Sequence, residues 1–297
     1  MDCHEFKSIH DIVNFRHKPH FLKWKYPSWI DKDELKKIPK AFKLFRKYTL
    51  NTGEILEGDG DNHIFCHPQK LNVLIENKNI LKANSNETLV VAGEDTTLEK
   101  KIEELKILKK YFKTIYYEAK NRYVDFVDTI PMGVTFAYLL RCGGSLTLQT
   151  INKTKHTKKE LIACAFNSKW NIQNLDRQNL QKLCVRNKFI NRHKWEPTEY
   201  FENISKFKFF ACPRGHGVQT PKICECILTQ TIPVVTKHPA HIDLYEHGIP
   251  MLMVDSWKDL NEDMLNSFYE EHGEGGIDWI SARNKYRVDC FQETFLD

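Results

Sequence analysis

The sequence predicts an α/β protein of two lobes, each built around a parallel sheet. Short apolar stretches alternate with amphipathic helical stretches, first from residue 71 and again from residue 160. Strand–helix–strand units of this length form parallel sheets. With 297 residues, of which 41% are hydrophobic, the chain is long enough for two domains with buried cores.

The first half contains three expected strands and two expected helices. Residues 1–50 are basic and aromatic, and a capped amphipathic helix is expected to begin at Asp31. A charged helix is expected over residues 98–112, where apolar residues recur every three or four positions. The expected strands are at residues 71–75, 88–92 and 114–117.

A polar, turn-rich stretch at residues 141–158 is the best linker candidate, and the strand–helix alternation resumes after it. We therefore predict domains over residues 1–155 and 156–280, with residues 281–297 forming a helix that packs back on the first lobe. Two-lobed α/β proteins bind ligands at the carboxyl ends of their strands. In the second half, strands are expected at residues 160–166, 208–213, 232–235 and 251–255, and helices at 176–187, 218–230 and from 259.

Charge, cysteine content and hydropathy exclude several classes of protein. The net charge of +5 is mild and gives no reason to expect a nucleic-acid partner. No signal peptide and no apolar run of membrane-spanning length is evident, so we expect a soluble, cytoplasmic protein. The nine scattered cysteines are expected to be reduced, buried thiols, since no zinc-ligand spacing is present.

The segment after the strand at 208–213 carries the clearest chemical signal. The strand runs into Pro213-Arg214-Gly215-His216-Gly217, where two glycines let backbone N–H groups approach a ligand closely. A helix then begins near Thr220 with Pro221 in its first turn, and helix N-termini bind phosphate. The position of His216 is compatible with contact to phosphate or sugar, and equally with a tolerated loop residue.

Charged residues around this turn complete a candidate nucleotide site. Arg214 and Lys222 add positive charge, and Glu225 lies three residues after Lys222. A carboxylate at that position would accept the hydroxyls of a ribose, as acidic residues do in dinucleotide-binding folds. The alternative is an ordinary strand–turn–helix with a solvated Arg214 and a salt-bridged Glu225.

The same stretch resembles the C-terminal signature of the exostosin-like glycosyltransferases. Residues 130–133, 165–168 and 244–257 also resemble small members of that family, and the resemblance is strongest over residues 203–257. The residues that carry it in this sequence are Ser205–Phe207, Pro213–Gly215, Lys222, Glu225 and Ile232–Val234.

The resemblance implies a GT-B fold, in which two Rossmann-like lobes face a central cleft and the C-terminal lobe holds a nucleotide-sugar. It implies inverting transfer without an obligatory metal or other cofactor, and it extends to short soluble enzymes of large DNA viruses. Lys222 stands where the family usually has Arg, and Pro221 where it has a small or polar residue. Arg177 is the natural match to a further donor-binding Arg of the family.

Inverting transfer needs a base for the acceptor hydroxyl, and we expect it from the N-terminal lobe. Asp59 and Asp61 lie in the densest carboxylate cluster there, and Asp95, directly after an expected strand, is the second choice. A polar turn is the alternative for both. Asp59-Gly-Asp61 also resembles the metal-binding motif of the GT-A glycosyltransferases, which would hold Mn²⁺ or Mg²⁺.

The sequence therefore predicts an inverting, metal-independent transfer of a sugar, such as xylose, from a UDP-sugar to a hydroxyl of a glycan acceptor. One alternative is a non-catalytic glycan- or partner-binding protein with the same fold. A second is a metal-dependent glycosyltransferase that uses Asp59 and Asp61. Spacing in the sequence identifies neither the sugar, the acceptor nor the oligomeric state.

Overall fold

The structure is a computed structural model of the chain. It describes residues 5–12, 48–50, 55–57, 63–83, 87–134, 136–166, 175–215, 217–273, 275–287 and 290. The helix expected from Asp31 lies outside these residues, as do Asp59, Asp61 and His216.

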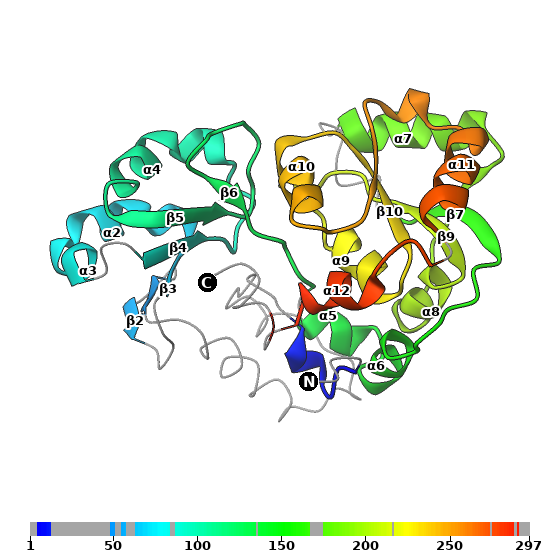
Figure 1. Cartoon of the computed structure of the whole chain (residues 1–297), viewed down its shortest axis with the longest axis horizontal. Helices are drawn as coiled ribbons and strands as arrows, with labels where there is room; N and C mark the ends of the chain where they lie inside the picture. The colour runs from blue at the N-terminus through cyan, green and yellow to red at the C-terminus, as the bar shows by residue number, and fades with distance from the viewer. Residues whose placement is uncertain are drawn as a thin grey trace.

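Two mainly parallel sheets organise the described chain (Figure 1). The first has the order β2-β1-β3-β4-β5-β6, in which all neighbours are parallel except β1 and β2. We call this sheet and its helices the first lobe. Its strands are β1 (Tyr48–Leu50), β2 (Ile55–Glu57), β3 (His63–Cys66), β4 (Glu87–Val91), β5 (Phe112–Tyr117) and β6 (Asp128–Thr129).

The helices of the first lobe cover the sheet with an apolar face. Leu71, Leu74 and Leu105 are fully buried against Ile64 and Leu89 of the strands. These helices are η3 (Pro68–Lys70), α2 (Leu71–Glu76), α3 (Lys78–Ala83), η4 (Leu98–Lys101) and α4 (Ile102–Leu108).

The second sheet has the order β11-β10-β9-β7-β8, and all of its neighbouring strands are parallel. We call this sheet and the helices packed on it the second lobe. Its strands are β7 (Glu160–Cys164), β8 (Ile190–Arg192), β9 (Phe207–Ala211), β10 (Ile232–Thr236) and β11 (Leu252–Val254).

The second sheet is buried on both faces. Phe209 belongs to the core on one face and Phe210 to the core on the other, as the two-residue period of a strand requires. Helices α7 (Leu175–Arg186) and α11 (Glu262–His272) cover the first of these faces. The second is covered by α5 (Phe136–Arg141), α6 (Ser145–Ile151), α8 (Tyr200–Ile204), α9 (Pro221–Leu228), α10 (Pro239–Glu246) and α12 (Trp279–Asn284). The described residues also include the short 3-10 turns η1 (Ile9–Asp11), η5 (Pro197–Glu199) and η6 (Trp257–Asp259).

The prediction of a strand at residues 71–75 is wrong, because these residues form α2. A strand would bury every second residue, whereas Leu71 and Leu74 are fully buried and Val73 is 37% exposed. That spacing is helical. The strand of this region is β3, whose four residues are all buried and therefore show no alternation in the sequence.

The stretch predicted as a linker contains ordered structure, because α6 occupies its middle and buries Thr147 and Ile151. The N-terminal turn and α12 join the same core: Phe6 is buried beside Arg283, whose Nη2 donates to the carbonyl of Ile151 at 2.5 Å. Residues from both ends of the chain therefore complete the core of the second lobe. The proposed domain boundaries stay a prediction.

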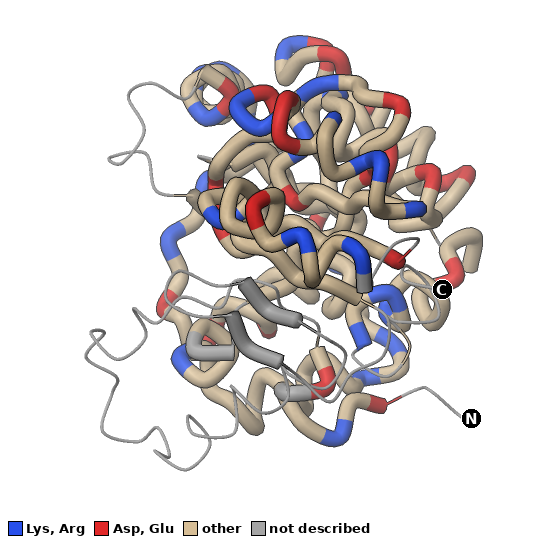
Figure 2. Tube along the Cα trace, turned by 90° about the vertical axis from the view of Figure 1, so that its left-hand side faces the viewer, with Lys and Arg blue, Asp and Glu red and all other residues tan. Residues whose placement is uncertain are grey.

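Charged residues are distributed over both lobes. In Figure 2, Lys and Arg positions are interspersed with Asp and Glu positions along the described chain. The expectation that nucleic acid is not a partner stays a prediction.

An ion pair between His247, at the end of α10, and Asp128 of β6 links the lobes, with Nε2 and Oδ2 2.8 Å apart. The hydrogen bond to Asp128 raises the pKa of His247 above 6.5. Burial raises the pKa of Asp128, but the bond and charge of His247 outweigh it, so this pKa lies below 3.8.

The stabilisation by this pair is complete between pH 3.8 and pH 6.5, which are the ordinary pKa values of aspartate and histidine. It disappears as the pH rises through the raised pKa of His247, or falls through the lowered pKa of Asp128. We expect His247→Gln to lose less than about 1 kcal/mol, since the pair is partly exposed. Urea unfolding at several pH values should show the difference from the wild type shrinking above pH 6.5. A constant difference would contradict this assignment.

Candidate functional site

The strand order of the second lobe marks a candidate ligand site between β7 and β9. The chain runs from β7 outward to β8 and then returns to the other side of β7 as β9. Such a reversal opens a crevice at the carboxyl ends of the two strands, where α/β proteins bind ligands. The segment after β9 and the first turn of α7, which follows β7, both lie at this crevice.

Asp176, in the first turn of α7, holds the segment after β9 in place. Its Oδ2 accepts a hydrogen bond from the backbone N–H of Arg214 at 2.8 Å. Its Oδ1 accepts from the indole of Trp257 at 2.9 Å and from the hydroxyl of Thr236 at 3.1 Å. Asp176 is only 5% exposed. Four segments of the second lobe therefore meet at one buried carboxylate.

Arg177 and Arg214 supply the positive charge of the crevice. The Nε of Arg177 donates to the carbonyl of Arg214 at 3.2 Å, and its Nη2 would lie 3.5 Å from a Cβ on Gly215. Burial lowers the pKa of Arg177, yet a guanidinium stays protonated in proteins. The structure thus brings together three residues that the sequence analysis selected: Arg177, Arg214 and Gly215.

Two histidines near Arg214 do not add to this charge. Burial, reinforced by the charge of Arg214, lowers the pKa of His238 to about 3. Burial also lowers the pKa of His241 to about 4, despite its hydrogen bond with the carbonyl of Thr236. Both imidazoles are therefore neutral near pH 7. Arg177 and Arg214 carry the local positive charge, and Asp176, whose Oδ2 lies 3.8 Å from Nε of Arg214, offsets part of it.

The first lobe approaches the segment after β9 at Asp95. Asp95, which follows β4, lies against Gly217: a Cβ on this glycine would be 2.9 Å from Oδ1 of Asp95. The glycine therefore permits a close approach between the lobes. Of the three candidate bases, Asp95 is the one that the structure describes, and it lies at the crevice.

Gln219 fastens the same segment to the first lobe. Its amide nitrogen donates to the carbonyls of Glu118 at 2.6 Å and Ile130 at 2.7 Å, and its amide oxygen accepts from the N–H of Met132 at 2.9 Å. Thr220 is buried directly after it and precedes α9. Arg214 is thus held from the second lobe and Gln219 from the first.

Lys222 and Glu225 form a second group with Tyr200 of α8. Lys222 donates to the Tyr200 hydroxyl at 2.7 Å, and this hydroxyl donates to Oε2 of Glu225 at 3.0 Å. Burial raises the pKa of Glu225, while Lys222 and Tyr200 oppose that shift. Glu225 is 2% exposed. In this conformation its carboxylate therefore faces Tyr200 inside the lobe.

Sequence reasoning missed Asp176 and Gln219, although each holds the loop after β9. A signal existed for Asp176, an acidic residue in the first turn of a helix that follows a strand. Gln219 had no comparable signal, because its three partners lie between 87 and 101 residues away in the sequence.

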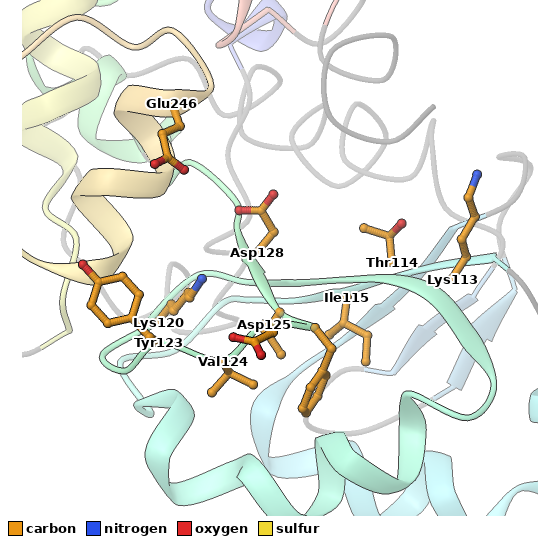
Figure 3. A pocket seen from close by; sticks show the side chains of 11 residues that line it. Lys113, Thr114, Ile115, Lys120, Tyr123, Val124, Asp125, Asp128 and Glu246 are labelled. Carbon is orange, nitrogen blue, oxygen red and sulfur yellow. The ribbon is translucent and has the colours of Figure 1, made fainter.

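A cavity of about 430 Å³ lies beside the lobe contact (Figure 3). It is lined by residues of the first lobe, including Lys113, Lys120 and Asp128, and by Glu246 of α10. Lys113 belongs to the amino-terminal part of β5, so the cavity reaches back along the edge of the sheet, away from the carboxyl ends of its strands. We therefore treat it as separate from the crevice.

Neither a metal centre nor a membrane span is found in the part of the chain that the structure describes. No three His, Cys, Asp or Glu side chains gather there as a metal ion requires. Within the same residues, each helix is too short or too polar to cross a membrane. Asp59 and Asp61 lie outside this part, so their assignment stays a prediction.

Comparison with known proteins leaves the family open. A scan against protein-family models gives no match, and a search of curated proteins gives none either. Among solved structures, the chain is similar to an alpha,alpha-trehalose-phosphate synthase (UDP-forming) from Burkholderia vietnamiensis. The TM-score is 0.39 and the identity 9%, over 78% of this chain and 69% of that chain. A similarity this remote defines no shared activity.

Proposed function

We propose that the protein is a glycosyltransferase that moves a sugar from a UDP-sugar to a hydroxyl group of a glycan acceptor. The observation that carries the proposal is the convergence of Arg177, Arg214 and Gly215 at the crevice between β7 and β9. Within this proposal the protein is of the GT-B, exostosin-like type, related to short soluble viral members and cytoplasmic, with a pentose such as xylose as the transferred sugar.

The charge at the crevice suits a departing nucleoside diphosphate. Two guanidinium groups and the N-terminus of α7 would stabilise the negative charge that develops when the bond to the sugar breaks. Arginine pairs with phosphate through two parallel hydrogen bonds, and the absence of a side chain at Gly215 leaves room for the ligand. This arrangement supports the proposal that a metal ion is not obligatory.

Arg177 offers a direct test of the diphosphate assignment. We expect Arg177→Ala to weaken the binding of UDP and of free pyrophosphate by about 10- to 100-fold, the worth of a hydrogen bond to a charged group. Calorimetric titration measures both affinities. The matched control is Arg186→Ala, at the exposed other end of α7, which should change neither. Equal losses in the two variants would contradict the assignment.

Glu225 is proposed as the ribose acceptor, which requires that its carboxylate turn from Tyr200 toward the nucleotide. Glu225→Gln should then weaken the binding of UDP and leave pyrophosphate binding unchanged. Loss of both, together with a lower Tm, would instead assign Glu225 to the internal contact with Tyr200. Lys222 and the loop residues Gly215, His216, Gly217 and Thr220 remain proposed donor contacts.

Asp95 is the proposed base for the acceptor hydroxyl, because it lies where the two lobes meet at the crevice. We expect Gly217→Ala to lower kcat by about 10- to 100-fold, since the added methyl group forces Asp95 from its place and general base catalysis of this kind is worth 10²–10⁴. Glu94→Gln is the matched control, because it changes the neighbouring carboxylate, whose hydrogen-bond partners are Gln69 and Thr96 of the first lobe. Transfer to a glycan acceptor from a radiolabelled UDP-sugar measures both, and equal rates would exclude the role.

Two alternatives give different results in the same transfer assay. Activity in EDTA should equal activity in added Mn²⁺; a strict requirement for the metal would favour a site at Asp59 and Asp61. Binding of donor and acceptor without transfer, for every pair tried, would favour a non-catalytic glycan-binding protein.

A further inference from the structure

A pair of thiols joins α7 to β7. Cys164 is the last residue of β7 and is fully buried, and Cys184 lies on α7 and is partly exposed. Their Sγ atoms are 3.5 Å apart. A small adjustment of the side chains would bring the sulfurs to bonding distance, about 2 Å.

The two thiols differ in the way that a disulfide-forming pair requires. The hydrogen bond shared by the two sulfurs lowers the pKa of Cys184 and raises that of Cys164, and the Arg192 guanidinium also favours the Cys184 thiolate. The thiolate is the nucleophile in thiol–disulfide exchange. Cys184 is therefore the more exposed residue of the pair, and its thiolate form is favoured by the shared hydrogen bond and by Arg192, with Cys164 beside it to complete the exchange.

We propose that Cys164 and Cys184 form a reversible redox-modification site, which a low-molecular-weight disulfide such as oxidised glutathione converts to an intramolecular disulfide. The Cys184 thiolate attacks one sulfur of glutathione disulfide, forming a mixed disulfide and releasing one glutathione thiolate, which takes up a proton. Cys164 gives up its proton and attacks the Cys184 sulfur, releasing the second glutathione. The protein loses two electrons and two protons, and two glutathione thiols form.

The bond would anchor the helix that organises the candidate site. Asp176 and Arg177 lie in the first turn of α7, two turns before Cys184, or about 12 Å along the helix axis at 1.5 Å per residue. A cross-link from α7 to the strand beneath it removes freedom from the unfolded chain, so the oxidised protein should have the higher Tm.

A second thiol pair serves as an internal control. Cys212 and Cys226 have their Sγ atoms 3.7 Å apart, but both residues are fully buried. If closeness alone decided reactivity, both pairs would oxidise. If access for the oxidant is also needed, only the pair of Cys164 and Cys184 reacts. Cys290 is partly exposed too, and its modification is separated from the others in a peptide digest.

The test treats the reduced full-length protein with oxidised glutathione, blocks the remaining thiols with N-ethylmaleimide and maps the peptides by mass spectrometry. We expect a peptide pair linked through Cys164 and Cys184, a higher Tm that dithiothreitol reverses, and alkylation of Cys212 and Cys226 only after denaturation. An unlinked Cys164 after prolonged oxidation would overturn the proposal.

Variants separate the two chemical steps. Cys164→Ala should stop the reaction at the mixed disulfide, so that glutathione accumulates on Cys184. Cys184→Ser, at the partly exposed position, should show neither the adduct nor the cross-link. Circular dichroism confirms that each variant is folded, and Cys164→Ser replaces Cys164→Ala if the latter unfolds. A link to Cys164 in Cys184→Ser, or no adduct on Cys184 in either Cys164 variant, would contradict the proposal. These outcomes are independent of the proposed function.

Discussion

Asp176→Ala should lower the free energy of unfolding by about 3–5 kcal/mol, because it leaves several buried donors without an acceptor. Those donors are the backbone N–H of Arg214, the indole of Trp257 and the hydroxyl of Thr236. Trp257 is 1% exposed, so water has no ready access to replace the lost carboxylate. Urea unfolding measures the change.

Two controls distinguish this effect from the loss of any aspartate. Asp255→Ala removes a carboxylate of the same lobe from an exposed pair with Lys237 and should change stability by less than about 1 kcal/mol. Asp176→Asn keeps one acceptor oxygen but presents an amide N–H₂ to one of the donors, so it should recover part of the loss. A loss below about 1 kcal/mol in Asp176→Ala would show that the loop after β9 is held by other contacts.

The loss of Asp176 should also remove the proposed binding of UDP, even under conditions where the protein stays folded. Asp176 accepts from the backbone N–H of Arg214 and lies 3.8 Å from its Nε, so both Arg214 and the Arg177 side chain bonded to its carbonyl would lose their positions. Because Asp176 acts through the loop, the conservative variant Asp176→Asn should recover part of the binding together with part of the stability. Full UDP affinity in folded Asp176→Ala would separate the loop from the proposed donor site.

The loop after β9 was predictable because its signals are local. An apolar strand, a turn with two glycines and a proline that begins a helix follow one another within about twenty residues, and the structure has β9, the loop and α9 in that order. Residues 71–75 show the opposite case. Their apolar run has the length of a strand. The helix that forms there, α2, is stabilised by its packing against α4.

The crevice itself was beyond prediction from spacing, because it depends on the order of the strands. β9 pairs with β7 although β8 lies between them in the sequence, and no local sequence pattern predicts this pairing. Arg177 was selected through a family resemblance. In the structure its Nε donates a hydrogen bond to the carbonyl of Arg214. Glu225 was placed correctly on a helix, yet its burial against Tyr200 depends on α8 packing over that helix.

Lys120→Met should be the most damaging change at the contact between the lobes. Lys120 follows β5, and its ammonium lies 2.7 Å from Oδ2 of Asp243 on α10. The side chains are 6% and 10% exposed. Removing one partner of a buried pair leaves an uncompensated charge and costs about 3–5 kcal/mol.

The Lys120 contact also predicts how the protein unfolds. Thr129 of β6 donates to the same Oδ2 at 2.6 Å, so Asp243 of the second lobe is held by two residues of the first. Without Lys120, the buried carboxylate favours separation of the lobes, because water then reaches it. Scanning calorimetry of Lys120→Met should therefore show the transitions of the two lobes moving apart.

A compensating variant decides whether the charge or the shape of this contact matters. Asp243→Leu and Thr129→Val, added to Lys120→Met, replace the polar cluster with apolar side chains of similar size, which is often neutral for a buried pair. We expect this triple variant to regain most of the lost stability and a single transition. If it stays as unstable as Lys120→Met, the cost lies in packing, and the unpaired charge on Asp243 is not its cause.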